Sequence, residues 1–160
     1  MTPSSDPGST GEVTREGRLP GLDYGTKRLG IAISDMDQTL AGSLETHIRC
    51  GPQGDARRLQ QIVKENLVVG IVVGLPVHMS GDEGGKAKEA RAFGEWVAEV
   101  TQLPLQYCDE RFTTATAEAR LMQADLSKKK FKQKLDKVAA QVLLQSFLDA
   151  KDRTLPPQPL

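Results

Sequence analysis

The sequence predicts an α/β fold in which helices cover a mixed sheet of five strands. Three strand-like segments follow one another near the start of the chain, and helical and strand-like segments alternate after them. Successive strands joined by short turns predict an antiparallel meander, whereas a strand, a crossover helix and another strand predict a parallel pair. The 160 residues can bury one proper core, which favours a single domain.

The two ends of the chain differ from the rest in composition. Residues 1–16 are rich in Ser, Thr, Pro, Gly and acidic residues and have almost no large apolar side chains. Such a segment cannot offset its own ordering entropy. Residues 151–160 contain prolines, which stop a helix. We therefore expect flexible tails at 1–16 and 151–160 and one folded domain at 17–150.

The first three strands are predicted at 19–22, 29–34 and 44–49. Gly25 lies between the first two and can adopt a positive φ at little cost, which predicts a tight hairpin. The region of Gly42 connects the second strand to the third.

The remaining elements alternate between apolar runs and amphipathic segments. The run at 67–76 is nearly continuous in apolar and β-branched residues, which is typical of a central strand buried on both faces. Asp55 is a candidate N-cap for the predicted helix that precedes this run. Helices are predicted at 55–66, 86–100, 113–125 and 135–150, and strands at 67–76 and 103–108.

The overall charge excludes one class of function. Lys plus Arg and Asp plus Glu number 21 each, so the chain lacks the electrostatic footprint of a protein that coats nucleic acid. Any site for a polyanion must therefore be local. No apolar stretch approaches the roughly 20 residues of a membrane span, and the start has no apolar signal core. We expect a cytoplasmic protein.

The cysteines and histidines do not form a recognisable motif. Cys50 and Cys108 are far apart and lack Cys-x-x-Cys spacing, so we expect free thiols rather than a metal or redox site. His47 and His78 are isolated in the sequence, and the pattern favours a catalytic or ligand role for neither.

Asp23 is the first candidate for a functional carboxylate. It lies at the end of the first predicted strand, where a rigid element can hold it in position to bind a hard cation or receive a proton. The alternative is a turn-forming Asp beside Gly25, because Asp is a preferred turn residue.

Further carboxylates occur at the ends of later elements. Asp109 and Glu110 follow the strand at 103–108, where open α/β sheets bind ligands, and the alternation of side chains lets only one of them face the site. Geometry alone does not choose between them, and a solvated pair is the alternative. Asp136 shares the sheet-facing side of the last helix with Ala140, although an acidic residue in a first turn also stabilises a helix.

A basic run precedes Asp136. The segment 126–134 contains Lys128, Lys129 and Lys130, and in an otherwise neutral chain it is a candidate polyanion site. A solvated lysine-rich surface explains this segment equally well.

Four segments, taken together, resemble one known family. They are Gly-Leu-Asp-Tyr-Gly-Thr-Lys-Arg-Leu-Gly at 21–30, Val-Val-Gly-Leu-Pro at 72–76, Asp-Glu-Arg-Phe-Thr-Thr at 109–114 and Leu-Asp-Lys-Val-Ala-Ala at 135–140. In this order they resemble the YqgF family of pre-16S ribosomal RNA nucleases and Holliday junction resolvase-like proteins. The resemblance covers about 19–150. It implies a ribonuclease H-like fold, a mixed five-stranded sheet whose first three strands are antiparallel and next two parallel, in agreement with the residue pattern.

The resemblance also implies a site and a chemistry. Asp23, Glu110 and Asp136 would be the catalytic and metal-binding residues, with Asp109 in reserve for the middle position. Mg²⁺ or Mn²⁺ is the implied cofactor, because such ions prefer carboxylate oxygen and can lower the pKa of an attacking water. One residue departs from the expected pattern: Lys137 follows Asp136, where we expect a small or uncharged residue in many relatives.

The substrate follows from the same resemblance. Lys27, Arg28, Arg111 and the lysines at 128–130 would bind phosphates. The implied function is processing of the 5′ end of pre-16S ribosomal RNA in ribosome biogenesis, with RNA precursors and ribosomal particles as partners and no membrane.

Three alternatives stay open beside it. The first is a Holliday junction resolvase-like DNA endonuclease, and the second is a non-catalytic nucleic-acid-binding or ribosome-assembly module. The third is an ATPase of the actin and sugar-kinase type, whose phosphate-binding hairpin resembles 23–26. Its two lobes need a longer chain, which disfavours it. The oligomeric state cannot be deduced from this sequence.

Overall fold

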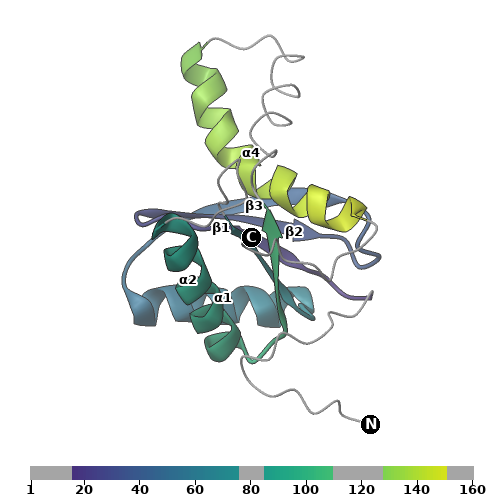
Figure 1. The fold of residues 1–160 in the computed structure, drawn as a ribbon. Coiled ribbons are helices and arrows are strands. Elements are labelled where there is room, and N and C mark those ends of the chain that lie inside the picture. The colour runs from purple at the N-terminus through teal and green to yellow at the C-terminus, as the bar shows by residue number, and fades with distance from the viewer. Residues whose placement is uncertain (1–15, 76–84, 110–127, 151–160) are drawn as a thin grey trace.

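The computed structural model describes residues 16–75, 85–109 and 128–150, with the backbone alone at 109 and 128–137 (Figure 1). Apart from residue 16, the predicted tails lie outside these residues, as does the predicted helix at 113–125. No helix within the described ranges is long and apolar enough to cross a membrane.

Five strands form one mixed sheet in the order β3-β2-β1-β4-β5. The strands are β1 (Pro20–Asp23), β2 (Arg28–Ser34), β3 (Ala41–Ile48), β4 (Ile71–Leu75) and β5 (Leu105–Asp109). β2 is antiparallel to both β1 and β3, whereas β4 is parallel to both β1 and β5. This topology confirms the predicted mixed sheet, with the first three strands antiparallel and the next two parallel.

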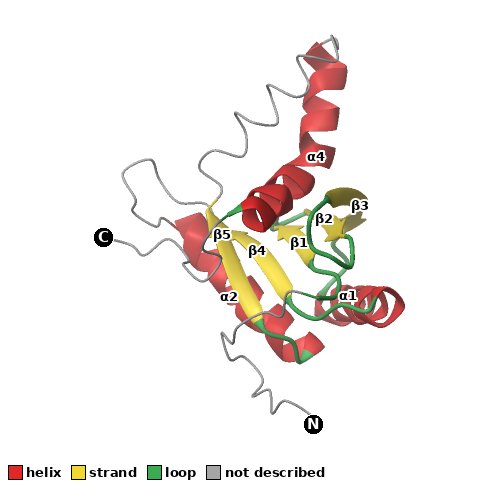
Figure 2. Ribbon diagram, turned by 90° about the vertical axis from the view of Figure 1, so that its right-hand side faces the viewer, coloured by secondary structure: helices red, strands yellow, loops and turns green. Residues whose placement is uncertain are grey.

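Helices cover both faces of this sheet. The helices α1 (Pro52–Asn66) and α2 (Gly85–Thr101) lie on one face, and α4 (Lys128–Asp149) lies on the other (Figure 2). In Figure 1 the C-terminal part of α4 lies along the sheet, while its N-terminal part extends away from it. Every residue of β4 is buried, as predicted for a strand covered on both faces.

The core is divided between the two faces. The larger cluster, on the side of α1 and α2, contains Leu59, Ile62 and Phe93. The cluster on the α4 side contains Ala140 and Leu144. Leu22 belongs to the first cluster, so alternation along β1 directs Gly21 and Asp23 to the α4 face.

The structure corrects two expectations about helix ends. Asp55 is not the N-cap of α1, because Gly51 takes that position and Pro52 follows it. The last helix begins at Lys128, so the lysine-rich segment 128–134 is helical rather than a connection. Sequence reasoning missed this extension because lysine runs suit an exposed helix as well as a loop.

Two further corrections concern turns. Gly25 does not have the positive φ that we expected. Glycine is needed there for space, because a Cβ at Gly25 would lie 2.4 Å from the Arg28 carbonyl oxygen. The apolar run at 67–76 begins with a turn: Leu67 adopts φ 52° and is 65% exposed, and the strand starts only at Ile71.

Candidate functional site

Asp23 is the last residue of β1 and lies beside α4, on the side of the sheet opposite the larger core cluster. It pairs with Gly30 of β2 and is half-buried. A Cβ placed on Gly30 would lie 3.4 Å from the Cβ atoms of both Asp23 and Ala140. The Asp23 carboxylate therefore starts from a rigid strand end next to α4, as the sequence predicted.

Small residues allow α4 to approach the strand that carries Asp23. A Cβ on Gly21 would lie 2.7 Å from the Leu144 Cβ, so only glycine fits under the helix without displacing it. Ala140, which is also small, lies above Gly30. The close packing thus depends on small residues in both the sheet and the helix.

Two glutamines fix α4 against the start of β3. Gln145 Oε1 accepts a hydrogen bond from the Ala41 backbone N–H at 2.9 Å, and Gln141 Nε2 donates one to the Ala41 carbonyl at 3.1 Å. Gln145 Nε2 also donates to the Thr39 carbonyl at 2.9 Å. These bonds hold the rotation of the helix about its axis, and with it the set of residues that faces the sheet.

Asp136 belongs to the described backbone of α4. It precedes Ala140 by four residues, so helical periodicity puts the two positions on the same side of the helix. Lys128, Lys129 and Lys130 form the first turn of the same helix, in the part that Figure 1 shows leaving the sheet. The structure describes only the backbone of these four residues, so the roles of their side chains stay predictions.

The ends of the parallel strands bring the first and middle carboxylate positions to one edge. β1, β4 and β5 run in the same direction, and Asp109 is the last residue of β5. Only β4 separates β1 from β5, so their backbones are about 10 Å apart at this edge. Glu110 and Arg111 lie outside the described residues. Lys27 lies in the β1–β2 connection beyond Asp23 and Arg28 begins β2, and both are exposed.

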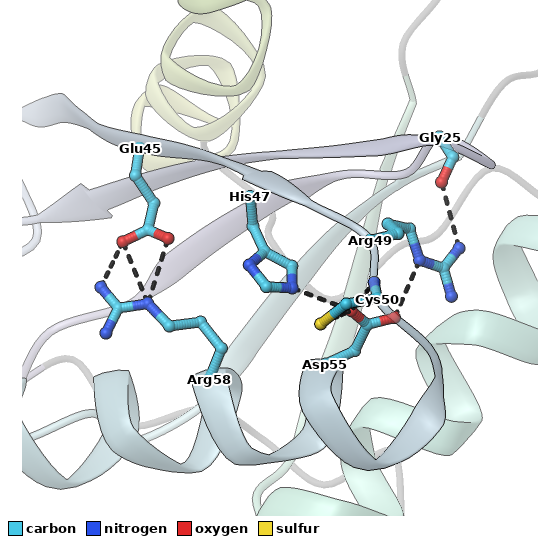
Figure 3. A network of polar contacts seen from close by, with 7 residues as sticks. All are labelled: Gly25, Glu45, His47, Arg49, Cys50, Asp55 and Arg58. Carbon is cyan, nitrogen blue, oxygen red and sulfur yellow. Dashed lines mark hydrogen bonds and ion pairs between the residues drawn. The ribbon is translucent and has the colours of Figure 1, made fainter.

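A second group of charged residues, the Asp55 network, joins the end of β3 to the start of α1 (Figure 3). Asp55 is only 1% exposed, and its Oδ1 lies 2.8 Å from His47 Nε2. The same oxygen accepts a hydrogen bond from the Cys50 backbone N–H at 3.0 Å, and Oδ2 accepts one from Arg49 Nε at 3.1 Å. Arg49 also donates to the Gly25 carbonyl at 3.1 Å. The network therefore ties β3, α1 and the β1–β2 turn together.

The network favours a charged Asp55. Burial raises the pKa of this carboxyl group, but the hydrogen bonds from Cys50, His47 and Arg49 and the charge of Arg49 outweigh burial, and the pKa is lowered. The buried charge is thus stabilised by its partners rather than neutralised.

Sequence reasoning missed this network. It treated His47 and Cys50 as isolated, yet the fold brings possible ligand atoms of His47, Cys50 and Asp55 within 4.8 Å of one another. Arg49 already forms an ion pair with Asp55, and its charge opposes a cation there, so the group has a sufficient structural explanation. The predicted free thiols are confirmed. The only sequence signal for the network was His-x-x-Cys-x₄-Asp across a strand-to-helix boundary.

Comparisons with known proteins identify a matching family and related chains. The family model described as "RuvX: Holliday junction resolvase" matches residues 17–150. A protein of Rhodopirellula baltica named "Putative pre-16S rRNA nuclease" is 48% identical over 134 residues, which cover 84% of this chain and 78% of that protein. A protein of the same name from Ligilactobacillus salivarius is 44% identical over 142 residues, covering 87% and 97%. Among solved structures, RuvC of T. thermophilus in complex with a Holliday junction substrate matches with a TM-score of 0.46 and 14% identity, covering 79% of this chain and 92% of that one.

Proposed function

The chain belongs to the RuvX (YqgF) family, and from this premise we propose that it is a metal-dependent nuclease that hydrolyses phosphodiester bonds in nucleic acid. The name shared by relatives that are 43–48% identical favours pre-16S ribosomal RNA as its substrate, and we propose processing of the 5′ end of this RNA as its reaction. The description of the family favours a branched DNA junction as the second candidate substrate.

One observation carries the proposal: Asp23 lies at a strand end on the face of the sheet that is covered by α4. Glycines in the sheet and Ala140 in the helix let α4 approach this face closely. A carboxylate on a rigid element keeps its position when a ligand binds. The helix that approaches it carries a second acidic residue, Asp136, on the same side as Ala140.

We assign Glu110 rather than Asp109 as the middle ligand of this site. Cys108 packs in the cluster on the α4 face, whereas Tyr107 packs in the cluster on the other face. Side chains alternate along a strand, so an extended backbone beyond Asp109 would return the next position to the α4 face. Asp109 stays in reserve for this position.

The donor set fits a hard divalent cation. Asp23 offers carboxylate oxygen, and the proposed partners Glu110 and Asp136 would offer the same ligand type, which Mg²⁺ and Mn²⁺ accept. Such an ion supplies charge neutralisation at the scissile phosphate and a lower pKa for an attacking water. The three carboxylates would hold it from separate elements of the fold.

The cationic residues would position the substrate. Lys27 and Arg28 are exposed next to Asp23, where they can neutralise phosphates close to the site. Arg111 would act from the other strand end, and the lysines at 128–130 would bind flanking backbone from the projecting part of α4. Ribosomal particles are further partners consistent with an RNA precursor, and this role would place the protein in the cytoplasm.

The proposal is tested by a cleavage assay on a pre-16S ribosomal RNA fragment and a four-way DNA junction, each with Mg²⁺, Mn²⁺ or EDTA. We expect cleavage only with metal, and we expect Asp23→Asn to lower the rate at least about 100-fold, because losing even an outer partner of a metal ligand costs 10- to 100-fold. Preference for RNA would support the first substrate, and preference for the junction the second.

The matched control is Asp37→Asn, because Asp37 is an exposed aspartate in the turn between β2 and β3. It should cleave like the wild type, and both variants should melt near the wild-type temperature. Binding of RNA without turnover, with equal affinity in wild type and Asp23→Asn, would instead show a non-catalytic binding module.

A further inference from the structure

A hollow of about 380 Å³ lies between the β1–β2 turn and α2. It is lined by Tyr24, Arg49, Pro52, Glu89, Ala92, Phe93 and Trp96. Its volume is within the range of pockets that take small ligands. Tyr24 directly follows Asp23 in the chain but packs with the cluster on the side of α1 and α2. The hollow therefore lies at the same end of β1 as Asp23 but on the opposite face of the sheet, and neither the proposed metal ligands nor the phosphate-binding residues line it.

Three aromatic rings form a continuous group at this hollow. The Phe93 ring centroid lies 5.0 Å from that of Tyr24 and 5.8 Å from that of Trp96, with the ring planes tilted by 41° and 36°. Phe93 is buried, whereas Tyr24 and Trp96 are partly exposed. The buried ring thus supports two rings that retain contact with the surface.

Arg49 adds a fixed positive charge to the same wall. Its guanidinium carbon lies 5.4 Å from the Tyr24 ring centroid and 5.3 Å from that of Phe93. Hydrogen bonds to Asp55 and the Gly25 carbonyl hold this guanidinium in position. The Asp55 network therefore fixes the position of Arg49 in the wall of the hollow, and it also joins β3 to α1.

Glu89 supplies the opposite charge on α2. Its side chain is exposed and lines the hollow. An ionised carboxylate only accepts hydrogen bonds, so it can accept from an exocyclic amino group of a base, and it repels a phosphate. The apolar rings would also leave a phosphate poorly solvated. The lining therefore suits a flat, polar-edged ring better than an anion.

We propose that this hollow binds an unpaired base of the nucleic-acid strand being cut, stacked against Tyr24 or Trp96. This inference rests on the proposed nuclease function and adds to it a requirement for an unpaired nucleotide near the cleaved bond. Bases stack on aromatic side chains and on arginine, and single-stranded segments are the parts of RNA whose bases are free to do so. Asp23 and Tyr24 are adjacent at one sheet edge, so a strand crossing that edge can place a phosphate by the first and a base by the second.

The chain contains a natural probe for this contact, because Trp96 is its only tryptophan. Tryptophan fluorescence of the full-length protein would be titrated in EDTA, where the proposed cleavage cannot occur, with a single-stranded RNA and with the same RNA in a perfect duplex. We expect saturable quenching by the single strand and none by the duplex. Equal quenching by both, or none by either while binding is seen by another method, would overturn the inference.

Two pairs of variants identify the residues involved. Tyr24→Leu should weaken single-strand binding roughly tenfold, the scale of losing one stacked base, while Tyr24→Phe should bind like the wild type. Glu89→Gln should reduce discrimination in favour of bases with amino groups over uracil, whereas Glu95→Gln, an exposed glutamate of α2 outside the lining, should not. Wild-type binding by Tyr24→Leu would contradict the proposed role.

The titration also separates this inference from the proposed function. Quenching by single-stranded RNA without metal-dependent cleavage of any substrate would support the base site and refute the nuclease. Cleavage that is equally fast beside paired and unpaired nucleotides, with Tyr24→Leu unchanged, would refute the base site alone. Melting temperatures of all variants would show that each is folded.

Discussion

The two faces of the sheet are packed in different ways. Beneath α1 and α2, large apolar side chains such as Leu59, Ile62 and Phe93 fill the space between helix and strand. On the α4 face, Gly21 and Gly30 place no side chain between sheet and helix, so Leu144 and Ala140 come close to the strands. The first arrangement maximises buried apolar area, and the second brings the backbone of α4 close to a strand-end carboxylate. One face therefore contributes most to stability, while the other builds the proposed site.

Two aspartates show the same contrast. Asp55 is buried and its oxygens contact His47, Arg49 and the Cys50 backbone, so its charge is already used by the fold. Asp23 is half-buried at a strand end, beside exposed Lys27 and Arg28. Asp55 is therefore explained as part of a structural junction, whereas Asp23 is carried by a rigid strand end on the face that α4 approaches closely.

The largest loss of stability is expected from a cavity on the α1 and α2 face. Leu59 is 3% exposed, and Leu59→Ala should lower the free energy of unfolding by about 3 kcal/mol through lost burial and an unfilled cavity. Urea denaturation measures this loss. At a temperature where the variant is folded, its cleavage rate should stay close to wild type. A large loss of activity without unfolding would contradict the proposal that the α1 and α2 face serves stability while the α4 face builds the site.

A smaller loss of stability, coupled to a loss of activity, is expected on the α4 face. Gly21→Ala adds a Cβ 2.7 Å from the Leu144 Cβ and should cost about 2 kcal/mol by overpacking. Because the helix must shift, metal-dependent cleavage should fall by more than in Leu59→Ala. Gly42→Ala is the control, since a Cβ there meets nothing within 4 Å. Unchanged cleavage by a destabilised Gly21→Ala would show that the helix position is not critical.

The smallest expected change comes from the Asp55 network and depends on pH. Asp55→Asn should lower the free energy of unfolding by about 1.5 kcal/mol at pH 7, because His47 and Arg49 lose a charged partner. The folded-state pKa of Asp55 lies below its usual value of 3.8, so its charge stabilises the fold above that value and the benefit disappears as the pH falls through the folded-state pKa.

Urea denaturation of both proteins at pH 7 and at pH 3 tests this dependence. The difference between wild type and Asp55→Asn should shrink at the lower pH. A difference that is the same at both pH values would mean that the charge of Asp55 is not what stabilises the junction.

Most of the described helices and strands were predicted from the sequence, because the pattern of apolar residues within a single segment indicates each of them. The alternation of 29–34, the uniform apolarity before Pro76 and the helical spacing of 86–100 each report how one segment meets the core. The start of the last helix was missed for the same reason: Lys128 to Lys134 carry no apolar periodicity, and only the continuous backbone of α4 shows that they are helical.

The sequence by itself determined the number and relative directions of the strands, the family and the candidate carboxylates, because these follow from periodicity and from motifs that are contiguous in the chain. Only the tertiary structure decided that Asp55 is a buried junction residue, that Gly25 serves close approach rather than positive φ, and that Tyr24, Arg49 and Trp96 share one hollow. Those properties depend on which distant atoms meet, and burial and partner distance are not encoded in the spacing of any one segment.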